Sequence, residues 1–82
     1  MRLPRDLSGH ELIRLLRRYG YERTWQIGSH IRLKSSIRGH VHHVTVPDHK
    51  SLRPGTLSQI LSDVADYLNI ERSNLAQELF DK

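Results

Sequence analysis

The residues best suited to chemistry in this sequence lie in the stretch QIGSHIRLK, residues 26–34. His30 follows a Gly-Ser pair and precedes two cations, Arg32 and Lys34, at alternate positions. An imidazole has a reference pKa of about 6.5, so it can accept or donate a proton at neutral pH. Neighbouring cations can hold a phosphate and stabilise negative charge. The spacing is therefore compatible with acid-base chemistry on a phosphate-containing substrate.

Composition limits the class of protein. The 82 residues are enough for one domain, which we expect to span residues 1–82 with a core at about 3–68 and a C-terminal extension at 69–82. There is no cysteine, no apolar run near the roughly 20 residues of a membrane span, and no apolar signal-peptide core in MRLPRDLSGH. We therefore expect a soluble cytoplasmic protein. Lys and Arg outnumber Asp and Glu by 13 to 9 and the pI is about 10.0, which suits a polyanionic partner.

A first helix is predicted over residues 8–20. Ser8 and Glu11 have the spacing of a capping box, Leu7 and Leu12 occupy the staple positions, and Gly20 stands where a left-handed residue ends a helix. An apolar stripe at spacings of three and four predicts the buried face, and it consists of Leu12, Leu15, Leu16 and Tyr19. The arginines at 14, 17 and 18 are interpreted as a solvated face.

The hydrophobic period then changes from 3.6 to 2. Strands are predicted at residues 21–27, 30–35 and 40–46, with a two-residue type II′ turn at Gly28-Ser29 and a second turn at 37–39. Pro47 ends the third strand. Thr56, with Gln59 three positions later, predicts the capped start of a second helix. Its apolar face consists of Leu57, Ile60, Leu61, Val64 and Leu68. Residues 73–80 are expected to add a short helical segment.

The predicted order is therefore α-β-β-β-α with an optional small helix. A three-stranded antiparallel meander with both helices on one face leaves its other face open. This α+β sandwich has the topology of double-stranded RNA-binding domains, although topology alone does not establish function.

The turn at Gly28-Ser29 predicts which side chains stand on the open face. It pairs Ile27 with His30, Trp25 with Arg32 and Arg23 with Lys34. Ile31 and Leu33 then point to the core, with Val44 and Val46 as their partners. This places Val41, His43 and Thr45 beside His30 and Arg32. The open face is expected to carry Arg23, Trp25, His30, Arg32, Lys34 and His43. Cations interleaved with an aromatic ring suit a phosphate backbone. Trp25 is the uncertain member, because a bulge, the C-terminal segment or a partner could cover it.

Four motifs occur in a fixed order: S-G-x-E-L at 8–12, Q-x-G-S-H at 26–30, T-V-P-x-H at 45–49 and G-T-L-x-x-I-L at 55–61. In this combination the chain, from about residue 3 to 68, resembles the HicA (YcfA-like) toxins, the messenger-RNA interferases of HicAB toxin-antitoxin systems. The resemblance implies a fold similar to a double-stranded RNA-binding domain. It implies that His30 is the catalytic histidine, and that a HicB-like antitoxin covers the His30 face. An arginine is common in the family where this chain has Trp25.

The chemistry that this resemblance implies needs no metal and no cofactor. RNA carries its own nucleophile, so the enzyme has to deprotonate the 2′-OH, stabilise the phosphorane and help the 5′-oxygen leave. We hypothesise that His30 is the general base or acid, that Gly28 makes the turn and that Ser29 donates a hydrogen bond. Arg32 and Lys34 would hold phosphate. The expected RNA-binding set is Arg23, Trp25, Arg32, Lys34 and His43.

Three alternatives remain at this point. The first is a non-catalytic RNA-binding module that uses the same surface. The second is a metal site formed by the histidines at 40, 42, 43 and 49, but strand alternation sends His42 to the edge of the core and His43 to the open face. The third is a DNA-binding repressor, which is weakened because neither helix is followed by the tight turn and second helix of a helix-turn-helix.

Overall fold

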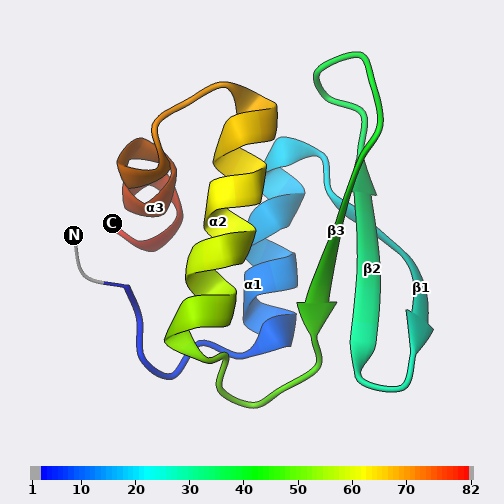
Figure 1. Cartoon of the computed structure of the whole chain (residues 1–82), viewed down its shortest axis with the longest axis vertical. Coiled ribbons are helices and arrows are strands. Elements are labelled where there is room, and N and C mark those ends of the chain that lie inside the picture. Colours follow the sequence, from blue (N-terminus) through cyan, green and yellow to red (C-terminus); the bar gives the residue numbers. More distant parts are fainter. Residues whose placement is uncertain (1–2, 82) are drawn as a thin grey trace.

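The computed structural model describes residues 3–81 and confirms the predicted α+β order (Figure 1). Three antiparallel strands form one sheet in the spatial order β1-β2-β3. The elements along the chain are α1 (Gly9–Leu16), the 3-10 turn η1 (Arg17–Tyr19), β1 (Glu22–Ile27), β2 (His30–Ser35), β3 (His42–Pro47), α2 (Pro54–Leu68) and α3 (Arg72–Phe80). The order is consistent with the fold of a double-stranded RNA-binding domain.

The start of α1 confirms the predicted capping box. The Ser8 side chain accepts a 3.0 Å hydrogen bond from the Glu11 N–H, and the Glu11 carboxylate accepts one of 2.9 Å from the Ser8 N–H. The hydrogen bond from the Ser8 N–H, followed by the one with the Ser8 hydroxyl, is the largest cause that favours the charged carboxylate and lowers the pKa of Glu11. At the other end, Gly20 takes the left-handed conformation with φ of 81° and turns the chain into β1.

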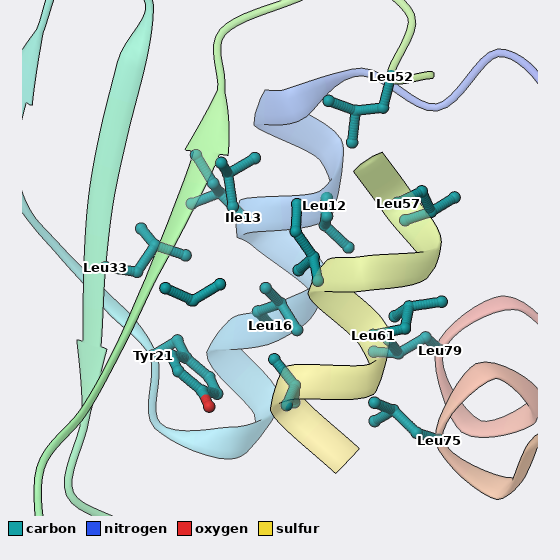
Figure 2. Close-up of a cluster of buried hydrophobic side chains, with 14 of the residues drawn as sticks. Leu12, Ile13, Leu16, Tyr21, Leu33, Leu52, Leu57, Leu61, Leu75 and Leu79 are labelled. Carbon is teal, nitrogen blue, oxygen red and sulfur yellow. The ribbon is translucent and has the colours of Figure 1, made fainter. Parts of the chain in front are cut away.

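The helices α1 and α2 cover one face of the sheet and leave the other face open (Figure 1). Apolar side chains of β2 and β3 point into this layer, namely Ile31, Leu33, Val44 and Val46. They meet Leu12 and Leu16 from α1 and Leu61 from α2 (Figure 2). All six residues of β1 are exposed, so this edge strand buries no side chain in the core. The core therefore fixes β2 and β3 directly and holds β1 through its pairing with β2.

The C-terminal helix α3 packs on the side of α2 that faces away from the sheet (Figure 1). Leu75, Ala76 and Leu79 are buried in the same hydrophobic cluster as the sheet residues (Figure 2). Arg18 donates a 2.6 Å hydrogen bond to the carbonyl oxygen of Glu78, whose carboxylate accepts one from the Tyr19 hydroxyl. The segment after residue 68 is thus tied to the end of α1 as well as to α2.

The predicted start of α2 at Thr56 is wrong. The helix begins at Pro54, its N-cap is Arg53, and no side chain caps it. Proline suits the first turn because its fixed φ is helical and its missing N–H would have had no helical partner there. Gln59 donates instead to Asp63, four residues along the helix. Although α2 is the longest helix, no helix within residues 3–81 is long and apolar enough to cross a membrane.

The predicted pairing of Arg23 with Lys34 is also wrong, because β1 contains a bulge between Arg23 and Trp25. Arg23 lies opposite Leu33, and Glu22 takes the place opposite Lys34. Paired residues share a face, so the extra residue sends Arg23 to the helix side of the sheet with Leu33. The open face therefore loses a cation and gains a carboxylate at this end.

Candidate functional site

The β1–β2 turn that carries the G-S-H motif has the predicted type II′ character. Gly28 has a φ of 56°, whereas Ser29 keeps a negative φ. The Gln26 side chain donates a 2.8 Å hydrogen bond to the Gly28 carbonyl oxygen. The Asp48 N–H donates one of 2.6 Å to the Ser29 carbonyl oxygen, which links the turn to the end of β3. The turn is therefore held from both sides.

His30 is the first residue of β2 and lies on the open face of the sheet. Its neighbours across the strands are Ile27 on β1 and Pro47 on β3. The side chain is exposed. Among residues 3–81, no carboxylate forms an ion pair with this imidazole. The imidazole is thus accessible from the solvent, beside the apolar surface of Ile27, which is 67% exposed.

Arg32, two residues along β2, occupies the centre of the open face. It lies between Trp25 on β1 and Thr45 on β3. Its Nη1 atom donates a 3.2 Å hydrogen bond to the Thr45 hydroxyl, and the Thr24 hydroxyl donates to its carbonyl oxygen at 3.1 Å. The guanidinium is half-buried and has a fixed side-chain partner, which leaves its other N–H groups free to meet an anion.

Trp25 is exposed on the face that the sequence predicts. The side chain retains 51% of its accessible surface, so neither the bulge nor α3 covers it. Ile27 stands two residues further along the same strand and the same face. Together they form an apolar strip along the outer strand, beside the cations of β2, and nothing else in residues 3–81 buries it.

Lys34 lies at the far end of the open face from the turn. It faces His43 on β3, which the sequence had placed beside His30 and Arg32, and Glu22 on β1, in the position predicted for Arg23. Glu22 lies five positions before Ile27, the partner of His30, which is about 16 Å along the strand at 3.3 Å per residue. Glu22 is therefore too distant to exchange a proton with His30, but it weakens the positive potential at Lys34.

The structure thus brings together five of the expected site residues on one face: Trp25, His30, Arg32, Lys34 and His43. Arg23 lies on the opposite side. The bulge that moves it has no glycine or other local signal in ERTWQI, so the alternation of the sequence did not reveal it.

The remaining histidines have structural contacts. His42 Nδ1 lies 2.7 Å from the Tyr21 hydroxyl, and the His42 ring stacks on Tyr67 with centroids 4.7 Å apart. Burial lowers the pKa of His42 and raises that of Tyr21. The Tyr67 hydroxyl also donates to the carbonyl oxygen of His40 at 2.6 Å. Tyr67, on the sheet side of α2, was missed by the sequence analysis, which counted only aliphatic residues on that face.

In the described part of the chain, no three His, Cys, Asp or Glu side chains lie close enough to share a metal.

A comparison with protein-family models agrees with the ordered motifs that the sequence contains. The family model described as the HicA toxin of bacterial toxin-antitoxin systems matches residues 9–65, which is well over half of the chain. Neither the curated proteins nor the solved structures gave a match. The matched segment begins with α1, contains the whole sheet and runs through most of α2. This chain belongs to the HicA toxin family of bacterial toxin-antitoxin systems.

Proposed function

We propose that the chain is a metal-independent endoribonuclease that cleaves messenger RNA in the bacterial cytoplasm through one histidine, His30. The observation that carries the proposal is the position of His30. It is an exposed imidazole at the turn end of a face that also presents Arg32 and Trp25. Membership of a toxin family whose members are messenger-RNA interferases supports the choice of substrate.

Each step of RNA cleavage has a candidate group on this face. His30 takes the proton of the 2′-OH, which then attacks the adjacent phosphorus, and returns a proton to the departing 5′-oxygen. Arg32 donates to the phosphate oxygens and stabilises the negative charge of the phosphorane. Ser29 donates a hydrogen bond at the turn, and Gly28 allows the backbone to make that turn. No step requires a metal or a cofactor.

The rest of the face would hold the RNA strand. Trp25 offers a flat apolar ring for a base, and such stacking tolerates any sequence because every base has a π-face. Lys34 and His43 extend the polar surface away from the turn. Arg23 can contribute only from the helix side of the sheet.

We further propose that a HicB-like antitoxin inhibits the toxin by covering the His30 face. An apolar strip of Trp25 and Ile27 beside a row of cations is suited to a protein partner that presents apolar and acidic groups. Such a partner would block RNA and shield His30 at once.

Incubation of purified protein with messenger RNA in excess EDTA tests the enzyme against the alternative of a non-catalytic RNA-binding module. The proposal predicts cleavage products that carry 2′,3′-cyclic phosphate or 3′-phosphate ends, with the same yield as without EDTA. Binding without turnover would favour the non-catalytic module, and products that disappear with EDTA would point to a metal.

A further inference from the structure

A second basic surface lies on the helix side of the sheet, where α1 faces β1. One hollow of about 240 Å³ is lined by His10, Ile13, Arg14, Arg17 and Arg23. An adjoining hollow of about 330 Å³ shares Arg17 and Arg23 and reaches Gly20. Because Arg17 and Arg23 line both hollows, the two adjoin at these arginines, and together we call them the α1–β1 groove.

The charged residues of the groove come from the first helix and from the edge strand β1. His10, Arg14 and Arg17 are separated by four and three residues, so they form one stripe along α1 and its continuation in η1. Arg23 comes from the edge strand and faces this stripe because the bulge turns it to the helix side of the sheet. A regular β1 would have placed Arg23 on the open face and left the groove with one arginine fewer.

The three guanidinium groups of the groove form no ion pair with a carboxylate of residues 3–81. Within residues 3–81 the one ion pair joins His10 to Asp48, so Arg14, Arg17 and Arg23 form none. The carboxylate nearest to Arg14 in sequence, Glu11, is already bonded to Ser8 in the capping box. Glu22 lines only the end of the groove near Gly20. Three like charges facing one hollow repel each other, and an anion that enters it relieves this repulsion.

The groove leads to the turn that carries the proposed catalytic residue. At its His10 end, the imidazole Nε2 atom lies 2.8 Å from an Asp48 carboxylate oxygen. The Asp48 N–H donates in turn to Ser29, which precedes His30. From His10 to Arg17 the helical stripe is about 10 Å long at 1.5 Å per residue. The start of α1 and the β1–β2 turn lie at the same end of the molecule (Figure 1).

We propose that the α1–β1 groove binds the phosphate backbone of the RNA strand that flanks the cleaved bond. The strand passes around the β1–β2 turn, with one part on the open face and the flanking part in the groove. Arginine suits this role because its planar fork donates to two phosphate oxygens at once. The inference rests on the proposed function, since it takes RNA as the substrate, and it adds a second contact surface on the other side of the sheet.

Salt dependence of binding tests the groove directly. The probe is a short 2′-O-methyl oligoribonucleotide, which lacks the attacking hydroxyl and stays intact. Each phosphate contact on a single strand contributes about 0.7 to the slope of log K against log salt concentration. Arg14→Gln, Arg17→Gln and Arg23→Gln are each expected to reduce that slope by about this amount. The matched control is Arg72→Gln on α3, which removes the same charge far from the groove and should leave the slope unchanged.

The inference is overturned if all three variants bind the oligoribonucleotide with the wild-type salt slope. That result is expected if the groove binds an acidic protein in place of RNA. The inference is also overturned if Arg72→Gln reduces the salt slope as much as the groove variants do, because the effect would then reflect net charge alone. A failure of this inference can be distinguished from a failure of the proposed function, because the test measures binding of an uncleavable strand and does not depend on cleavage by His30. In the cleavage reaction, the groove variants should raise KM more than they lower kcat.

Discussion

Gly9 and Pro47 meet where α1 begins and β3 ends, with no room between them for a side chain. A Cβ atom at Gly9 would overlap the carbonyl oxygen of Pro47 and would lie 3.1 Å from its carbonyl carbon. The Gly9 N–H donates a 2.9 Å hydrogen bond to the His49 carbonyl oxygen. Since Pro47 is the β3 partner of His30, this contact ties the first turn of α1 to the strand end beside the site. It also gives a structural reason for the glycine in S-G-x-E-L.

Gly9→Ala should therefore destabilise the protein. The new methyl group must push α1 away from β3, and overpacking of this kind typically costs about 1–3 kcal/mol of unfolding free energy. Urea denaturation measures the change. The matched control is Gly55→Ala in the first turn of α2, where a Cβ meets nothing within 4 Å. That variant should gain about 0.4–1 kcal/mol through the unfolded state. Equal stability of the two variants would show that the α1–β3 approach is not tight.

Stability should fall as the pH drops below about 6.5, the value at which an unperturbed histidine titrates. Burial lowers the pKa of His42, an effect that outweighs the opposing attraction of Asp63. As the pH falls below about 6.5, His42 becomes protonated in the unfolded chain while it stays neutral in the folded chain. The free energy of unfolding therefore decreases from about pH 6.5 down to the folded pKa of His42. Above pH 6.5 this contribution is fully present. Burial also raises the pKa of Tyr21, whose hydroxyl lies 2.7 Å from Nδ1 of the His42 ring.

His42→Gln tests this assignment, because the amide offers an acceptor to Tyr21 but cannot titrate. Thermal melts of this variant should depend less on pH between about 5 and 7 than those of the wild type. The neighbouring His43→Gln, on the exposed face, should retain the wild-type dependence. If both variants retain it, His42 is not the source of the acid sensitivity.

Trp25→Ala should weaken RNA binding while leaving the fold intact. A base stacked on an aromatic side chain contributes about 1–3 kcal/mol, so the Kd for single-stranded RNA should rise roughly 5- to 150-fold. Because the ring is 51% exposed, its removal should change the thermal melt only slightly. Ile37→Ala, in the β2–β3 loop and 55% exposed, controls for loss of an apolar surface residue. Unchanged RNA affinity in Trp25→Ala would mean that no base stacks there.

Glu22→Gln should strengthen RNA binding. Glu22 lies opposite Lys34 without forming an ion pair, and its negative charge lowers the positive potential that a phosphate would meet there. Exposed pairs of this kind contribute about 0.2–1 kcal/mol, so a gain of up to about fivefold in affinity is expected at low salt. Glu71→Gln, which precedes α3, removes the same charge away from the sheet and is the control. A loss of affinity in Glu22→Gln would contradict the arrangement at this end of the face.

The parts of the fold that were predictable are those that short-range chemistry determines. The capping box of Ser8 and Glu11 and the left-handed Gly20 follow from local backbone preferences. The Gly28-Ser29 turn sets the register of His30, Arg32 and Trp25, and this register is confirmed. Alternation of apolar residues then correctly separates Ile31 and Leu33 from the open face.

The parts that were not predictable depend on tertiary contacts. The bulge before Trp25 shifts the pairing of β1 with β2 without a residue type that signals it, and without the bulge Arg23 would stay beside Lys34. The start of α2 was misplaced because the Thr56 and Gln59 spacing imitates a capping box, while the first turn is already formed at Pro54. Arg23 joins the α1–β1 groove only because of the bulge, so the three arginines could not be assigned to one surface beforehand.

The central claim is that His30 performs the proton transfers. Its most direct test is the rate of messenger-RNA cleavage in EDTA by the wild type and by His30→Ala, with His43→Ala as a matched variant on the same face. We predict that His30→Ala cleaves messenger RNA more slowly by at least about 10²–10⁴-fold, the contribution typical of a general acid-base residue. Its RNA affinity and its melting temperature should stay at the wild-type values. His43→Ala should retain most of the rate. Cleavage by His30→Ala at a rate near that of the wild type would contradict the account.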